Sequence, residues 1–199
     1  MQANTRLNKG DWDKNPAPDF HQRYCGIVGS LGYVVTMTRS ELARANSELS
    51  RYVQFPGKNH MLAAEHILSY LRGTWNQTIR YSHKSHENPN VLWGWVGADW
   101  AGDTDTCRSH TGYILMMNGG LLSWKSRRQD NVSCSTSEAE FVAASQAGQE
   151  AIYLREELTH FVFSQTQATL LYKDNVACVA MSENLVRRKV SCHIGIRKY

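Results

Sequence analysis

The segment from Trp93 to Asn175 constrains the fold more than any other part of the chain. It predicts three successive strands, a long helix with apolar side chains at helical spacing over residues 137–163, and a fourth short strand. The predicted strands cover residues 91–99, 111–117, 121–125 and 169–172. The hairpin turn Asn118-Gly119-Gly120 makes the first three an antiparallel meander. A meander followed by helix and strand predicts an α/β fold with a mixed sheet and a right-handed crossover.

Three acidic residues lie where these predicted elements begin or end. Asp99 ends the first strand, Glu140 lies in the first turn of the long helix, and Asp174 ends the fourth strand. Strand ends can converge at one edge of a sheet, and carboxylate oxygens are the ligands that Mg²⁺ prefers. The pattern predicts a divalent metal site formed by Asp99, Glu140 and Asp174.

Each of these acids also has an ordinary structural interpretation. Glu140 follows Ser137 by three residues, which is the spacing of a capping box. Asp174 can cap the helix predicted over residues 175–184, and Asp99 can simply end its strand in a turn. From the residues alone, both interpretations stay open for each acid.

The part of the chain before residue 90 predicts a small helical subdomain. Residues 1–23 are mostly polar and predict a tail. Helices are expected over residues 24–37, 38–52 and 59–72, the second starting with a capping box between Thr38 and Glu41. His60 and His66 are six residues apart, so they are interpreted as surface or satisfied core histidines. The polar link that contains His83, His86 and Glu87 leaves a histidine-based metal site as a weaker alternative.

Composition restricts the class of protein. The chain has 199 residues, 42% apolar content and a net charge of +4, which permits a substantial core and contact with nucleic acid. Its 5 cysteines are scattered without a Cys-x-x-Cys pair, which indicates neither a zinc site nor a disulfide framework. No apolar run is long enough to cross a bilayer. We therefore expect an intracellular protein without a membrane partner.

Several short motifs follow one another in a specific order along the chain. They are Ile27-Val28-Gly29-Ser30-Leu31, Tyr70-Leu71-Arg72-Gly73-Thr74, Ala98-Asp99-Trp100-Ala101-Gly102-Asp103, Ser137-Glu138-Ala139-Glu140-Phe141 and Tyr172-Lys173-Asp174-Asn175. This ordered set resembles the C-terminal part of the copia-type retrotransposon polyprotein. The resemblance implies the end of a reverse transcriptase over residues 24–89. It implies a ribonuclease H-like domain over residues 90–199, cut short at its C-terminus.

The resemblance also implies a chemistry. Members of this family cut the RNA strand of RNA–DNA hybrids with two Mg²⁺ ions held by four carboxylates. Carried over by position, Glu140 is the second of these acids and Asp174 the third. The implied partners are an RNA–DNA hybrid and the rest of the polyprotein. The implied location is a cytoplasmic particle or the nucleus.

Two glycines depart from the family pattern. Gly97 stands where the first acid is expected, with Asp99 two residues further along the same strand, and Gly195 stands where the fourth is expected. Two functions follow from this. One is a ribonuclease H that acts within an intact polyprotein, with Asp99 in place of the missing acid. The other is a decayed ribonuclease H-like module that binds nucleic acid or a partner without cleaving.

Overall fold

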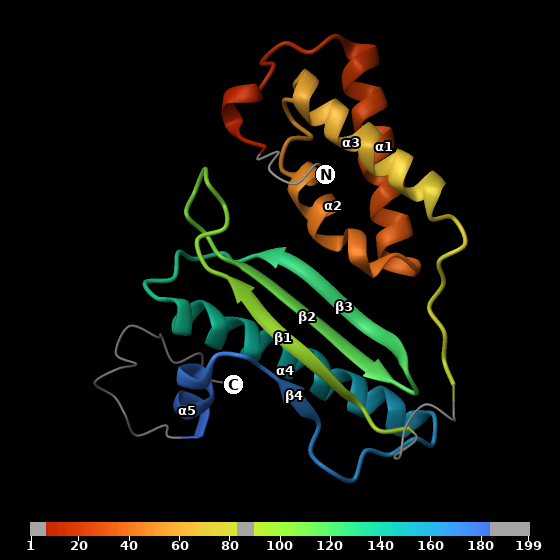
Figure 1. The fold of residues 1–199 in the computed structure, drawn as a ribbon, viewed down its shortest axis with the longest axis vertical. Coiled ribbons are helices and arrows are strands. Elements are labelled where there is room, and N and C mark those ends of the chain that lie inside the picture. The colour runs from red at the N-terminus through yellow and green to blue at the C-terminus, as the bar shows by residue number, and fades with distance from the viewer. Residues whose placement is uncertain (1–6, 83–89, 184–199) are drawn as a thin grey trace. The chain divides into compact units, whose positions relative to one another are not determined.

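The computed structural model describes residues 7–82 and 90–183 of the chain (Figure 1). The chain divides between Ile79 and Arg80 into two compact units, here called the helical unit and the sheet unit. The predicted link with His83, His86 and Glu87, and the C-terminal motif with Gly195, lie outside the described residues. Within the described residues, no helix combines the length and apolar character that crossing a bilayer requires.

The helical unit consists of helices packed around one apolar core. They are η1 (Lys9–Asp11), α1 (Pro18–Met37), η2 (Ser40–Leu42), α2 (Ala43–Ser50) and α3 (Lys58–Gly73). Tyr24, Leu31, Leu49 and Ile67 are almost completely buried in this core. The Tyr24 hydroxyl donates a hydrogen bond of 2.9 Å to the Leu49 carbonyl, so the aromatic side chain is buried without leaving its polar atom unsatisfied.

The N-terminal segment differs from the predicted tail over residues 1–23. Leu7 is only 6% exposed and belongs to the core of the helical unit, and Trp12 packs against it. Helix α1 begins at Pro18, six residues before the predicted start. Proline is favoured in the first turn of a helix, where its missing N–H has no intrahelical partner, so Pro18 starts the helix instead of excluding it.

The second helix, in contrast, begins later than predicted. Thr38 is the C-cap of α1, and α2 begins at Ala43 after the short helix η2. Glu41 accepts a 2.6 Å hydrogen bond from the Arg39 side chain, and that guanidinium also donates to the side chain of Thr74. Glu41 is therefore engaged by Arg39, and this contact replaces the predicted capping box between Thr38 and Glu41.

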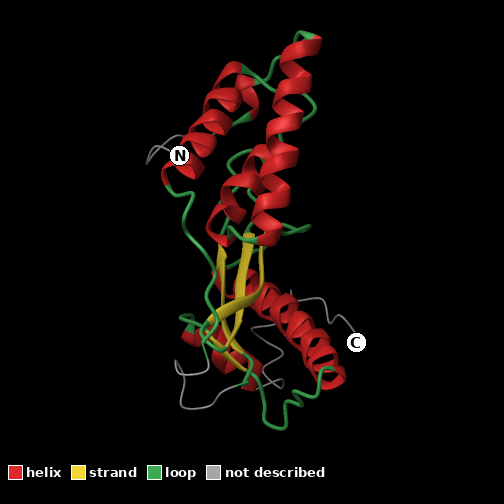
Figure 2. Ribbon diagram, turned by 90° about the vertical axis from the view of Figure 1, so that its right-hand side faces the viewer, coloured by secondary structure: helices red, strands yellow, loops and turns green. Residues whose placement is uncertain are grey.

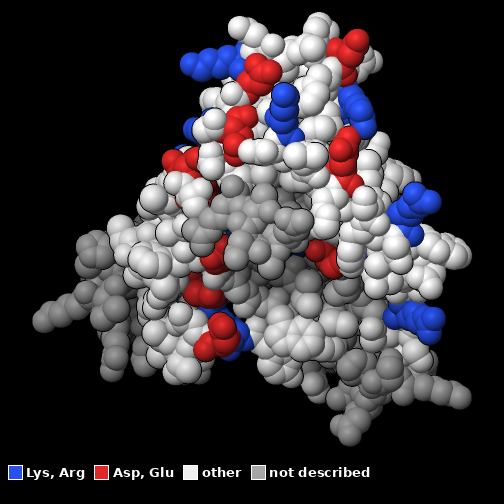
Figure 3. Space-filling view, turned by 45° about the horizontal axis from the view of Figure 1, so that its top comes forward, with Lys and Arg blue, Asp and Glu red and all other residues white. Residues whose placement is uncertain are grey.

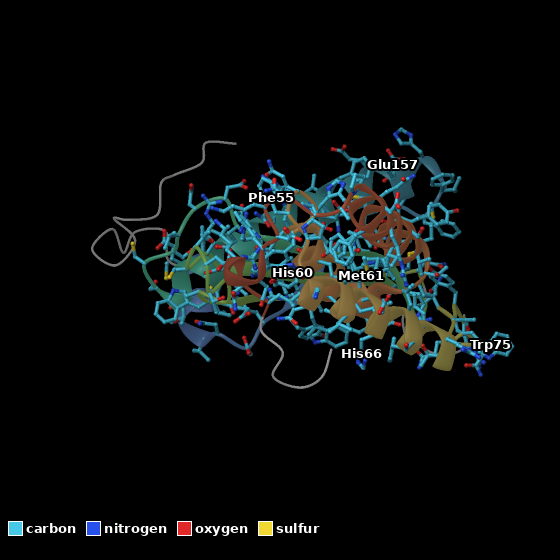
Figure 4. All side chains as sticks on the ribbon, turned by 90° about the horizontal axis from the view of Figure 1, so that it is seen from above. Phe55, His60, Met61, His66, Trp75 and Glu157 are labelled. Carbon is cyan, nitrogen blue, oxygen red and sulfur yellow. The ribbon has the colours of Figure 1, made fainter. Side chains whose placement is uncertain are left out.

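The two histidines of α3 have the ordinary positions that their spacing predicts. His60 is buried, and its Nδ1 accepts the Gly57 backbone N–H at 2.9 Å. His66 is exposed, and Figure 4 shows it at the outer side of α3, away from His60. The prediction that each is a surface or a satisfied core histidine is confirmed, with His60 in the core and His66 at the surface.

The sheet unit contains the predicted mixed sheet. Its elements are β1 (Trp93–Asp99), β2 (His110–Met117), β3 (Gly120–Arg128), α4 (Thr136–His160), β4 (Leu170–Tyr172) and α5 (Val176–Glu183). The strand order is β3-β2-β1-β4, with β4 parallel to β1 and the other pairs antiparallel. The unit begins before the predicted residue 90, because Ser82 donates its N–H to the Asn118 carbonyl in the β2–β3 turn at 2.8 Å.

Helix α4 covers one face of this sheet, as Figure 2 shows. Its buried alanines (Ala139, Ala143, Ala147 and Ala151) recur every four residues, so the helix lies close to the strands. Leu92 and Val96 of the β1 segment point into this core. Trp93 and Trp95 lie on the opposite face, where both rings contact Tyr172.

The N-cap of α4 is Ser135 and not Ser137. The Ser135 hydroxyl accepts the Glu138 N–H at 3.1 Å, and the Glu138 carboxylate accepts the Cys134 N–H at 2.7 Å. We expect Ser135→Ala to lower the free energy of unfolding by about 1 kcal/mol, the usual contribution of a serine cap. Urea denaturation of both variants tests this, with Ser137→Ala as the matched control. An equal loss in Ser137→Ala would contradict the assignment.

Candidate functional site

The carboxylate of Glu140 lies at the end of the sheet, next to strand β1. Glu140 is only 8% exposed, and its Oε1 accepts the Ala98 backbone N–H at 3.0 Å. Strand β4 pairs with β1 only from Trp93 to Trp95, so no β4 backbone reaches Ala98. The Glu140 side chain takes this open position at the edge of β1 and satisfies the backbone group there.

A lysine from the end of β4 neutralises this carboxylate. The Lys173 ammonium group donates to Glu140 Oε2 and, at 2.9 Å, to the Glu140 carbonyl. The two side chains are 5% and 10% exposed, which makes them a buried ion pair. Leu171 packs into the core beneath α4 and Tyr172 lies on the other face, so alternation along the chain brings Lys173 to the α4 side.

The start of α5 closes the other side of this ion pair. Cys178 is 1% exposed; burial raises the pKa of its thiol, and the nearby Lys173 opposes that shift. The Cys178 N–H donates to Asn175 Oδ1 at 2.9 Å, so Asn175 caps α5. Capping by Asp174 is therefore wrong, and the Asp174 side chain is exposed.

Asp99 lies at the end of β1 and is exposed. A Cβ atom added at Gly102 would lie 2.0 Å from Asp99 Oδ2, so this carboxylate is folded over the turn that follows its strand. Asp99 thus takes part in a turn, as its structural interpretation predicts.

The structure does not gather the three predicted acids into one metal site. In residues 7–82 and 90–183, no group of three or more His, Cys, Asp or Glu side chains is placed to hold a metal ion. Lys173 and the Ala98 N–H already engage Glu140. A Cβ atom at Gly97 would meet no atom within 4 Å, so the position of the missing acid is open space. The described residues do not fit a magnesium site.

Lys173 is the residue of the candidate site that the sequence patterns did not single out. It lies within the motif Tyr172-Lys173-Asp174-Asn175, directly before the acid that the resemblance emphasises. Its signal is the period of two in a strand: Leu171 packs toward α4, so Lys173, two residues later, falls on the same side.

Comparison with known proteins identifies relatives over nearly the whole chain. The chain is 36% identical over 197 residues, 99% of its length, to the retrovirus-related Pol polyprotein from transposon TNT 1-94 of Nicotiana tabacum. It is 35% identical over 173 residues to the corresponding polyprotein from transposon RE1 of Arabidopsis thaliana. These matches cover 14% and 12% of the two polyproteins, so the chain spans about an eighth of their length.

A shorter relative is matched over most of its own length. Secreted RxLR effector protein 161 of Plasmopara viticola is 37% identical over 131 residues, which is 66% of this chain and 90% of that protein. No family model matches the chain, and no solved structure matches it. The chain is therefore similar, over nearly its whole length, to one segment of the retrovirus-related Pol polyproteins of plant transposons.

Proposed function

We propose that the sheet unit is a ribonuclease H domain of a copia-type retrotransposon polyprotein, which in this chain binds RNA–DNA hybrid without cutting it. The polyprotein relatives and the mixed sheet with α4 on one face support the domain assignment. The proposed loss of cleavage rests on one observation, the ion pair between Glu140 and Lys173.

Metal-assisted hydrolysis requires carboxylates that are free to bind a cation and orient its water. Glu140 has one oxygen on the Ala98 N–H and the other on the Lys173 ammonium. Gly97 supplies no side chain, and Asp99 is turned into its own loop. An active ribonuclease H in an intact polyprotein is the alternative function, and a cleavage assay separates the two.

Binding of the hybrid is proposed from the family and from the basic residues of the sheet unit. Lys125 and Arg127 on β3 are exposed and offer contacts to phosphate. On the face drawn in Figure 3, basic and acidic side chains are interspersed. We therefore expect binding that is moderate and strongly dependent on salt.

The test uses the purified chain and a fluorescent RNA–DNA hybrid with Mg²⁺ present. We expect binding in fluorescence anisotropy and no RNA product on a denaturing gel. Lys125→Ala/Arg127→Ala should weaken binding and reduce the salt slope by about 1 for each lost phosphate contact. Lys58→Ala, an exposed lysine of the helical unit, is the control. Magnesium-dependent cleavage by the unaltered chain, or an absence of hybrid binding, would refute the proposed function.

A further inference from the structure

We infer that the Lys173 ammonium group fills a cation position in the sheet unit and thereby excludes divalent metal ions. Removing this charge should open a site for Mg²⁺ or Mn²⁺ at Glu140. The inference rests on the proposed function, since it names the residue that keeps the metal out of that same site.

The position of the Lys173 ammonium has the ligands of a cation site. Two oxygens of Glu140, the carboxylate Oε2 and the backbone carbonyl, converge on the Lys173 nitrogen. Both are hard oxygen donors of the kind that Mg²⁺ and Mn²⁺ bind. Water is largely excluded, because the two side chains are 5% and 10% exposed. An uncompensated carboxylate here would be costly, so the position favours occupation by some cation.

The Glu140 carboxylate does not depend on Lys173 alone for its orientation. Its second oxygen, Oε1, is held at 3.0 Å by the Ala98 N–H, and its main chain lies in the first two turns of α4. A variant without the lysine charge therefore retains an anchored carboxylate. Such an anchored carboxylate is a starting ligand for a metal ion.

The lysine and a metal ion exclude each other at this position. A divalent ion bound by Glu140 would lie about 2.0–2.6 Å from its oxygens, in the space that the ammonium group occupies. The ammonium is also tethered to the chain, so it competes as an intramolecular ligand with a high effective concentration. Dissolved Mg²⁺ at millimolar concentration should not displace it.

Gly97 offers the place for a second carboxylate. The Ala98 N–H that holds Glu140 belongs to the peptide unit joining Gly97 to Ala98, so the two positions are neighbours. The space beyond the Gly97 Cα is open to a distance of 4 Å. Val96 and Ala98 pack toward α4, so Gly97 lies on the opposite face of β1, and an aspartate there has to reach around the strand edge that β4 leaves open. It adds an acid at the cation position only if Lys173 is also replaced.

The experiment compares four full-length proteins: the unaltered chain, Gly97→Asp, Lys173→Met and Gly97→Asp/Lys173→Met. Binding of Mn²⁺ is measured by loss of its free electron paramagnetic resonance signal, and Mg²⁺ by the shift in the thermal unfolding midpoint. We expect no binding by the first two proteins, weak binding by Lys173→Met and at least tenfold tighter binding by the double variant. Lys58→Met, which removes an exposed charge of the helical unit, should behave like the unaltered chain.

Two results would overturn the inference. One is Mn²⁺ binding by Gly97→Asp that equals that of the double variant, which would mean that the lysine does not block the metal. The other is a folded double variant that binds no Mn²⁺. If circular dichroism shows Lys173→Met to be unfolded without metal, Mg²⁺ should refold it, and failure to do so also counts against the inference. Lys173→Gln then repeats the test with a polar side chain.

The outcome is separable from that of the proposed function. Hybrid binding by the unaltered chain, together with no metal in a folded double variant, rejects the role of Lys173 and leaves the proposed function standing. Metal binding by the double variant, together with no hybrid binding by the unaltered chain, supports the role of Lys173 and rejects the proposed function.

Discussion

Lys173→Met is expected to lower the free energy of unfolding of the sheet unit by about 3–5 kcal/mol in metal-free buffer. The substitution leaves the Glu140 carboxylate buried with the Ala98 N–H as its remaining partner among those described above. A buried charge that loses its counter-ion keeps the full cost of its removal from water. Guanidinium denaturation, followed by circular dichroism, measures the loss.

Two further variants distinguish the contribution of the ion pair to stability from the contribution of side-chain packing. Glu140→Gln alone should also destabilise, because it leaves the Lys173 ammonium buried beside a neutral amide. The double variant Glu140→Gln/Lys173→Met removes both charges with little change in volume, so it should recover most of the stability that either single variant loses. Losses that simply add in the double variant would show that the two charges do not act as a pair.

Asp103→Ala is expected to cost about 2–3 kcal/mol, the second largest effect. The Asp103 side chain is completely buried in the loop between β1 and β2. Its Oδ2 accepts hydrogen bonds from Arg128 (2.7 Å) and from the Thr106 hydroxyl, and its Oδ1 accepts the Asp105 N–H at 3.0 Å. Because Arg128 is about one-third exposed, solvent reduces the share of the ion pair itself, and most of the cost comes from the unsatisfied donors.

The measurement is chemical denaturation combined with hydrogen exchange of the loop over residues 100–109. Asp103→Asn keeps an oxygen acceptor and should lose less stability than the alanine variant. The control is Asp130→Ala, which removes an exposed ion pair with Arg127 and should cost less than about 0.5 kcal/mol. If the two alanine variants were equally stable, Asp103 would not anchor the loop.

The order of elements in the sheet unit could be predicted because it depends on local patterns. The alternating side chains of β1 and the helical spacing in α4 are properties of short segments, and the turn Asn118-Gly119-Gly120 fixes the neighbouring strands as a hairpin. The N-terminal boundaries could not be predicted in this way. Leu7 and Trp12 are held by contacts with distant helices, and a polar local composition does not reveal such contacts.

The residue that caps the N-terminus of α4 also could not be predicted from the local sequence. Ser135 and Ser137 are each followed three residues later by a glutamate, so the capping-box pattern fits both equally. The Glu140 carboxylate contacts Ala98 and Lys173, which come from the two strands next to it, and is therefore not used in a cap. Ser135 and Glu138 form the cap instead.

The sequence by itself determined the mixed sheet, the long helix on it, and the arrival of Glu140 near the ends of β1 and β4. Only the tertiary structure decided which neighbour meets that carboxylate. Leu171 of β4 packs beneath α4, and Lys173, two residues later, reaches the same side, where it is buried against Glu140, while Asp174 is exposed. A buried carboxylate requires a cation, and the lysine side chain supplies one from within the chain.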